Sequence, residues 1–205
     1  MKKMYFKNQR GYTIIETMIA VSLFLVIIMA GMGALLNANL LHQKSQSMRS
    51  IMDSLSFIME DIGRSLRTGY GYRCLVVGED TLPTASMSTP KSCVSGWGIA
   101  FESANGVPGD NNDQWIYYIG TNGIDSNIRI FKSTAGPASL SNFIQMTPDE
   151  VAIDSNSFFS VLGAEMPPDA RQPFVTIKLI GTITFKNVVT PFSLQTSVSQ
   201  RLIDI

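Results

Sequence analysis

Arg10-Gly11-Tyr12-Thr13-Ile14-Ile15-Glu16 is the stretch that decides the fold, together with the 25 uncharged residues that follow it, 17–41. A helix rises about 1.5 Å per residue, so this run is longer than the ~30 Å hydrocarbon core of a bilayer. Its length predicts a membrane-spanning helix. The only charges ahead of it are cations (Lys2, Lys3, Lys7 and Arg10), which predicts a cytoplasmic N-terminus.

A secretory signal peptide would instead be cut after its apolar core, within small residues. Residues 34–38, Ala-Leu-Leu-Asn-Ala, are a poor version of such a site. The better processing signal precedes the apolar run, at Gly11, where a backbone without a side chain can enter a narrow protease site. A cut there would remove residues 1–11 and keep the whole apolar helix.

These residues, 7–16 and the apolar run behind them, resemble the type III signal of type IV pilins and type II secretion pseudopilins. The resemblance implies that a membrane-embedded prepilin peptidase cuts after Gly11 and N-methylates Tyr12. It also implies other pilins or pseudopilins and an inner-membrane assembly platform as partners. The family usually has phenylalanine at the new first position, so Tyr12 is a departure, although an aromatic one. The motif covers about thirty residues of the chain.

Glu16 is the one charge within the apolar region, and a carboxylate at the centre of a membrane helix costs about 2.5 to 3.5 kcal/mol. Cleavage would free an α-amino group at Tyr12, which is largely protonated at neutral pH. In a neighbouring subunit this cation could face Glu16, so that assembly neutralises both charges. The alternative is that Glu16 stays at the membrane surface and interacts favourably with its own helix dipole.

The helix is expected to continue beyond the membrane to about Leu66, for about 80 Å in all, and to stop near Gly69. Apolar residues recur there at helical spacing, which predicts a stripe that packs on a globular domain. The members of the stripe are Leu41, Met48, Ile51, Met52, Leu55, Ile58, Met59, Ile62 and Leu66. The expected organisation is a leader (1–11), an assembly helix (12–41), an amphipathic helix (42–68) and a β-rich domain (69–205).

Alternating apolar and polar residues in the last part of the chain predict an antiparallel sheet with one face on the helix. The expected strands are 96–102, 114–119, 127–132, 151–162 with a break near Asn156, 174–185 with a bend at Gly181, and 192–203. The fold class is therefore α+β and pilin-like. The closing strands, from 151 onward, loosely resemble the C-terminal half of minor pilins and of J-type or W-type pseudopilins.

Cys74 and Cys93 enclose a segment rich in glycine, proline, serine and threonine. In an oxidising periplasm they could form a disulfide worth about 3 kcal/mol. Two free thiols packed as small hydrophobic groups are the alternative.

Cleavage after Gly11 would remove the four cations of the leader. The mature chain would then carry 12 cations and 16 anions, and this net negative charge does not suggest general nucleic-acid binding.

Signals for catalysis are weak, and we expect neither an enzyme nor a cofactor. The single histidine, His42, lies where the chain would leave the membrane, which disfavours a histidine-based triad.

Two groups of residues are candidates for binding sites. Asp110, Asn112 and Asp113, with Asn111 between them, carry the hard oxygen ligands that Ca²⁺ takes, but they lack the EF-hand spacing and also fit a plain solvated turn.

The second group mixes basic and aromatic residues: Arg64, Arg67, Tyr70, Tyr72 and Arg73. Such a mixture could stack on single-stranded DNA, although cations are favoured at a helix C-terminus in any case.

Together with the resemblance described above, the sequence predicts a minor pilin or pseudopilin, anchored in the inner membrane with its globular domain in the periplasm. The alternatives are a tip subunit that binds DNA or a surface, and a single-span protein with a periplasmic enzyme domain.

Overall fold

The computed structural model describes residues 11–82, 89–107, 109–121, 123, 126–165, 171–185 and 188–201. The expected leader lies outside these residues except for Gly11. The chain divides into two compact units, of which the first ends at Gln46 and the second begins at Ser47. One helix, α1 (Ile14–Thr68), supplies residues to both units, and all the strands belong to the second.

Helix α1 ends one residue before Gly69, as the sequence predicts. A Cβ at Gly69 would lie 2.3 Å from the Phe101 ring, so close packing requires glycine at this helix end. The predicted apolar stripe is confirmed from Met48 to Leu66, because its members are buried or partly buried against the strands. Leu41 does not belong to it. Its side chain is 68% exposed and lies in the first unit, so the packed part of the helix begins later than expected.

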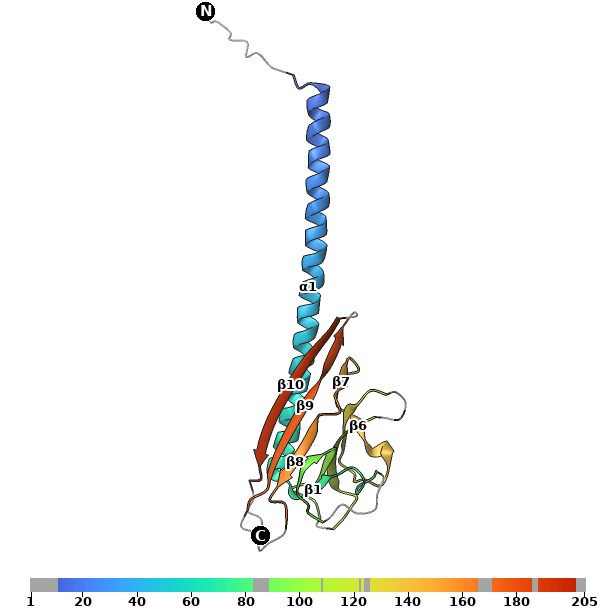
Figure 1. Ribbon diagram of the computed structural model, residues 1–205, viewed down its shortest axis with the longest axis vertical. Helices are drawn as coiled ribbons and strands as arrows, with labels where there is room; N and C mark the ends of the chain where they lie inside the picture. The colour runs from blue at the N-terminus through green and yellow to red at the C-terminus, as the bar shows by residue number, and fades with distance from the viewer. Residues whose placement is uncertain are drawn as a thin grey trace, which may run out of the picture. The chain divides into compact units, whose positions relative to one another are not determined.

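The strands form two antiparallel sheets rather than the single sheet expected (Figure 1). The first has the order β1-β3-β4-β5-β6, with β1 (Tyr70–Leu75), β3 (Gly98–Glu102), β4 (Gln114–Gly120), β5 (Arg129–Ser133) and β6 (Ile144–Gln145). The second has the order β10-β9-β8-β2, with β2 (Cys93–Gly96), β8 (Phe158–Leu162), β9 (Phe174–Phe185) and β10 (Val188–Ser199), and β7 (Val151–Ile153) also pairs with β9. A short 3-10 helix, η1 (Leu140–Asn142), lies between β5 and β6.

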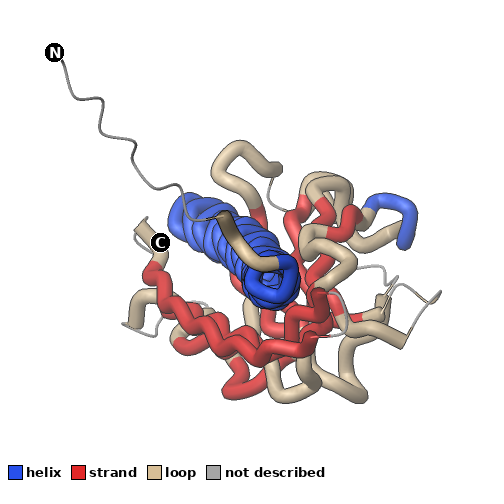
Figure 2. The backbone as a smooth tube through the Cα atoms, turned by 90° about the horizontal axis from the view of Figure 1, so that it is seen from above, coloured by secondary structure: helices blue, strands red, loops and turns tan. Residues whose placement is uncertain are grey.

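The core lies between the second half of α1 and the strands, which lie below the helix and to its right in the view of Figure 2. Leu55, Ile62 and Leu66 of the helix are fully buried with Tyr72, Phe101 and other strand residues.

A polar contact also joins the helix to the first sheet. Lys132 Nζ lies 2.8 Å from Asp61 Oδ2, and Tyr117 donates a hydrogen bond to the same oxygen at 3.1 Å. Burial raises the pKa of Tyr117, and the nearby Asp61 raises it further, so the hydroxyl stays protonated as a donor.

Strand β9 has the expected bounds and runs without interruption through Gly181. The glycine is needed there for space. A Cβ there would lie 2.4 Å from the Ala152 carbonyl oxygen and 2.9 Å from the Phe192 ring, on the two neighbouring strands. The break expected near Asn156 is confirmed, because β7 and β8 pair one after the other with β9 and residues 154–157 separate them.

Strand β10 is the outermost strand of the second sheet and pairs with β9 over its whole length. Among the described residues no strand pairs with its other edge. Its buried and exposed residues alternate as the sequence predicts, with Val198 in the core and Ser197 and Ser199 exposed. Pro191 lies inside this strand, which fits an edge position because proline has no N–H for a sheet partner.

Candidate functional site: the processing and assembly segment

Gly11 and Tyr12 lie ahead of α1 and are exposed, Tyr12 to 82%. The helix begins at Ile14, and Thr13 caps it. The Glu16 N–H donates to the Thr13 carbonyl oxygen at 3.1 Å and lies 3.4 Å from Thr13 Oγ1. Thr13-Ile14-Ile15-Glu16 thus has the T-x-x-E spacing of a helix capping box. Gly11 and Tyr12, which the sequence predicts to flank the cleavage site, therefore lie outside the helix and are accessible to an enzyme.

Glu16 lies in the first turn of α1, where a negative charge interacts favourably with the helix dipole. It is exposed, and no ion pair involving it occurs within the described part of the chain. Thr13 was not singled out from the sequence, although the T-x-x-E spacing is a signal that could have found it. The printed contacts between Glu16 and Thr13 use the main-chain N–H of Glu16, so they do not involve the carboxylate that the proposed pairing needs.

The helix in the first unit has apolar side chains on all its faces. Phe24, Val26, Leu35 and Leu36 are each at least 60% exposed, and the same is true of most large side chains between Ile14 and Leu41. By length and composition, α1 is able to cross a membrane, and it is the one such helix in the described residues. An apolar surface of this extent is unfavourable in water and needs lipid or protein around it.

Comparison with known families places a specific motif on this segment. Residues 6–32 match the model of the prokaryotic N-terminal methylation motif. The chain carries the prepilin signature of type IV pilins and pseudopilins. The signature covers Gly11, Tyr12 and Glu16, and with the apolar helix it fits a membrane-anchored, pilin-type structural subunit. Comparisons with curated proteins and with solved structures gave no match.

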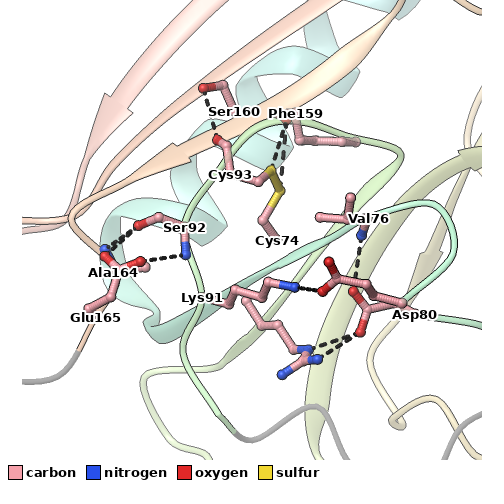
Figure 3. The surroundings of a disulfide bond; sticks show 12 residues. Cys74, Val76, Asp80, Lys91, Ser92, Cys93, Phe159, Ser160, Ala164 and Glu165 are labelled. Atoms are coloured by element: carbon pink, nitrogen blue, oxygen red, sulfur yellow. Dashed lines mark hydrogen bonds and ion pairs between the residues drawn. A yellow bond between two sulfur atoms is a disulfide. The ribbon is translucent and has the colours of Figure 1, made fainter.

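The predicted disulfide, far from the prepilin signature in sequence, is present between Cys74 and Cys93, whose Cα atoms are 5.8 Å apart (Figure 3). Cys74 lies on β1 and Cys93 on β2, so the bond joins the two sheets. Gly96 makes room for it, because a Cβ there would lie 2.4 Å from Cys74 Sγ. The covalent link therefore lies in a tightly packed part of the second unit.

Polar contacts order the chain on both sides of the disulfide (Figure 3). The Arg73 guanidinium lies 2.7 Å from Asp80 Oδ1, and the Val76 N–H donates to Asp80 Oδ2 at 3.0 Å. Burial raises the pKa of Asp80, but the hydrogen bonds from Val76 and Arg73 outweigh it and hold the pKa below its usual value. On the other side, the Ser92 N–H and hydroxyl donate to the Glu165 carboxylate at 3.0 and 2.6 Å.

The basic and aromatic residues weighed for DNA do not form one exposed surface. Tyr72 is 1% exposed, and its hydroxyl donates to main-chain carbonyl oxygens at the end of α1. Arg73 is held by Asp80, and Tyr70 donates to the Gly106 carbonyl oxygen at 3.0 Å. Arg64 pairs with Glu60 on the helix surface and lines a groove of about 490 Å³ with Arg67 and β10. The Tyr72 ring is thus not available for stacking on a base.

The loop at residues 110–113, considered from the sequence as a Ca²⁺ site, makes two separate sets of hydrogen bonds. Asp110 Oδ1 accepts hydrogen bonds from the backbone N–H and the side-chain amide of Asn112, at 2.9 and 3.0 Å. Asp113 Oδ2 accepts from the Val107 N–H at 2.7 Å. No group of three or more His, Cys, Asp or Glu side chains able to hold a metal is found in the described residues. Glu102, which was not singled out from the sequence, lies at the end of β3 and accepts a hydrogen bond from Gln114 Nε2 at 2.9 Å.

Proposed function

We propose that the chain is a minor pilin or pseudopilin, a structural subunit that assembles through the first half of α1 into a type IV pilus or a type II secretion pseudopilus. The methylation motif at residues 6–32 carries this proposal. The β-rich second unit, with its two sheets and its disulfide, is larger than a simple four-stranded head and favours a minor subunit at the tip or at initiation.

Processing follows from the exposed residues ahead of the helix. The prepilin peptidase would cut after Gly11, remove residues 1–11, and methylate the amino group of Tyr12. The four cations of residues 1–11 hold the N-terminus in the cytoplasm, which puts the disulfide-bonded second unit in the oxidising periplasm. The assembly platform of the inner membrane would then receive the mature subunit.

Assembly covers the apolar surface of residues 14–41, first with lipid and then with the helices of sister subunits. In this arrangement the cationic amino group of Tyr12 neutralises Glu16 of a neighbour. The single chain supplies no such partner, because Glu16 forms no ion pair in its described residues. The carboxylate therefore favours the assembled state over the isolated subunit in lipid.

Two substitutions distinguish the contribution of the Glu16 charge from the contribution of its side chain to the capping box. Glu16→Gln keeps an amide that fits the capping box but removes the charge, and Glu16→Ala removes both. We expect both variants to be cut and methylated, as checked by mass spectrometry of the mature N-terminus, and both to be missing from filaments isolated from the host. The wild-type chain should start at methylated Tyr12.

Crosslinking in intact cells measures the contacts between subunits directly. A wild-type pattern of contacts in Glu16→Gln would contradict charge pairing and leave the capping role. An uncut wild-type chain, with residues 1–11 still attached and no sister subunits bound, would contradict the whole proposal.

A further inference from the structure

Glu102 is a buried acid whose two carboxyl oxygens have different surroundings. It lies at the end of β3, is 5% exposed, and pairs in register with Gln114 at the start of β4. Its Oε1 accepts a hydrogen bond from Gln114 Nε2 at 2.9 Å. Its Oε2 is also buried, and no N–H or hydroxyl group in the described part of the chain donates to it. A buried oxygen of this kind is uncommon in folded proteins and requires an explanation.

Asp113, at the other end of the β3–β4 loop (residues 103–113), has the same pattern. Its Oδ2 accepts from the Val107 N–H at 2.7 Å, whereas its Oδ1 is buried and receives no hydrogen bond from an N–H or hydroxyl group of the described residues. The Glu102 and Asp113 side chains hydrogen-bond to each other. Because the other two oxygens are already engaged, this bond joins Glu102 Oε2 to Asp113 Oδ1. Two ionised carboxylates have no donor between them, so one of the two groups must carry a proton.

The surroundings of this carboxyl pair favour the proton. Tyr70 of β1, Gln114 of β4 and Asp110 of the loop are the polar side chains that interact with it. Burial raises the pKa of Glu102 most, and the Asp113 and Asp110 carboxylates raise it further, while the hydrogen bond from Gln114 lowers it in part. Burial and the two acids of the pair also raise the pKa of Tyr70, so its hydroxyl stays protonated. None of the ion pairs in the described residues includes Glu102, Asp110 or Asp113, so no cation takes the place of the proton there.

The carboxyl pair lies under the β3–β4 loop. A Cβ at Gly106 would lie 3.1 Å from Glu102 Oε2, so the loop backbone passes close to the oxygen that shares the proton. The Tyr70 hydroxyl donates to the Gly106 carbonyl oxygen at 3.0 Å, and Asp113 accepts a hydrogen bond from the loop backbone. Loss of the shared proton would leave two negative charges in contact at a buried place, where like charges repel strongly. The contacts of the loop with the sheet are the ones that this repulsion would break.

We propose that Glu102 and Asp113 share one proton, and that this carboxyl pair closes the β3–β4 loop over the sheet at low pH and releases it when the proton is lost. A group whose pKa is higher in the folded state contributes stability that is fully present below its unfolded pKa and is lost as the pH rises through its folded pKa. Asp80, whose pKa is lowered, acts in the opposite direction. This response to pH is a property of the second unit and is independent of the assembly function.

Glu102→Gln reproduces the protonated acid with a side chain that does not titrate. Its amide oxygen can accept from Gln114 and its amide NH2 can donate to Asp113 Oδ1, so the hydrogen bonds of the closed loop are kept. In thermal unfolding of the full-length protein in detergent, the midpoint of this variant should exceed the wild-type midpoint by about 2 to 4 °C at about pH 8. The two midpoints should approach each other at about pH 4, close to the ordinary pKa of a glutamate.

Amide hydrogen exchange, followed by mass spectrometry of peptides from residues 103–113, measures the opening of the loop itself. At about pH 8 these amides should exchange several-fold faster in the wild type than in Glu102→Gln, and a comparison at one pH cancels the intrinsic effect of pH on exchange. Asp154→Asn is the control. Asp154 lies in the loop between β7 and β8 and accepts hydrogen bonds from Asn156, so this variant loses a negative charge away from the carboxyl pair. It should follow the wild type in both measurements.

Glu102→Gln combined with Asp113→Asn separates a shared proton from simple repulsion between charges. With both acids replaced, two amide NH2 groups face each other unless one residue gives up its bond to Gln114 or to the Val107 N–H. The double variant should therefore unfold at a lower temperature than either single variant. A double variant as stable as the single variants would show that relief of repulsion alone matters, and would contradict the shared proton.

Three further results would overturn the proposal. The first is a midpoint difference between Glu102→Gln and the wild type that is the same at both pH values, because Glu102 would then not change its protonation between them. The second is a wild type that is the more stable of the two at about pH 8, since the site would then require the carboxylate. The third is loop exchange that Glu102→Gln leaves unchanged. If Glu102→Gln does not fold, Asp113→Asn takes its place, because its amide can donate to Glu102 Oε2 and its oxygen can accept from the Val107 N–H.

Discussion

The disulfide between Cys74 and Cys93 should be a main source of stability in the second unit. Removing it with Cys74→Ala and Cys93→Ala together releases a loop whose ends are 19 residues apart in sequence. The chain-entropy relation gives about 3 kcal/mol for a loop of this length. For a chain of this size, that loss lowers the unfolding midpoint by about 6 to 12 °C. Alanine is the better replacement for Cys74 because the residue is fully buried and a serine hydroxyl there would need a partner.

The assay compares the wild type and the double variant in detergent, each with and without reductant, by near-ultraviolet circular dichroism on heating. Reductant should lower the wild-type midpoint to near that of the variant and leave the variant unchanged. The variant also loses the packing of two sulfur atoms, so reduced wild type is the cleaner measure of the bond itself. A wild-type midpoint that falls by less than about 2 °C on reduction would refute the reasoning, as would free thiols in the oxidised protein.

Two further predictions concern single residues of the second unit. Asp80→Asn removes a carboxylate whose pKa lies below its ordinary value of 3.8, so the wild type should be more stable than the variant above that pH and lose the advantage as the pH falls below it. Urea unfolding should show a difference of about 1.5 to 3 kcal/mol at pH 7 that shrinks at about pH 3, and equal differences at both would contradict this. Gly181→Ala should cost about 1 to 3 kcal/mol because its Cβ would clash with Ala152 and Phe192, whereas Gly33→Ala, with nothing within 4 Å, should not destabilise the fold. Matching unfolding midpoints for these two variants would show that β9 adjusts freely at Gly181.

The helix and the long strands were predictable because their patterns are periodic. Ile51, Leu55, Ile58 and Ile62 recur at helical spacing and are buried, and β9 and β10 alternate as a two-residue period requires. Leu41 has the right spacing but is exposed, since spacing alone does not say where a helix begins to pack. The sequence likewise predicted one sheet where the structure has two, because alternation shows which residues face the core but not which strands pair.

Strand β1 and the acid at the end of β3 were missed for related reasons. The segment Tyr70-Gly71-Tyr72-Arg73 has a glycine with φ of 65° and no clear alternation, and its basic and aromatic residues were interpreted as a possible DNA-binding group and not as a strand. Glu102 is separated in sequence from Asp113, and only the pairing of Glu102 with Gln114 brings the two together. Pairing the predicted strands 96–102 and 114–119 as a hairpin would have placed Glu102 and Asp113 at the two ends of the connecting loop. That pairing could have been predicted from the sequence.

Pro191 has a consequence for subunits that wait side by side in a membrane. An outermost strand as long as β10 invites the same strand of a second copy to add to the sheet, and repeated addition leads to insoluble aggregates. Proline cannot donate a backbone hydrogen bond, so a second copy would meet an interrupted row of donors in the first third of the strand. In the proposed assembly, subunits that are crowded together would thereby avoid contact through their sheets, and the apolar helices would provide the contacts of an ordered polymer.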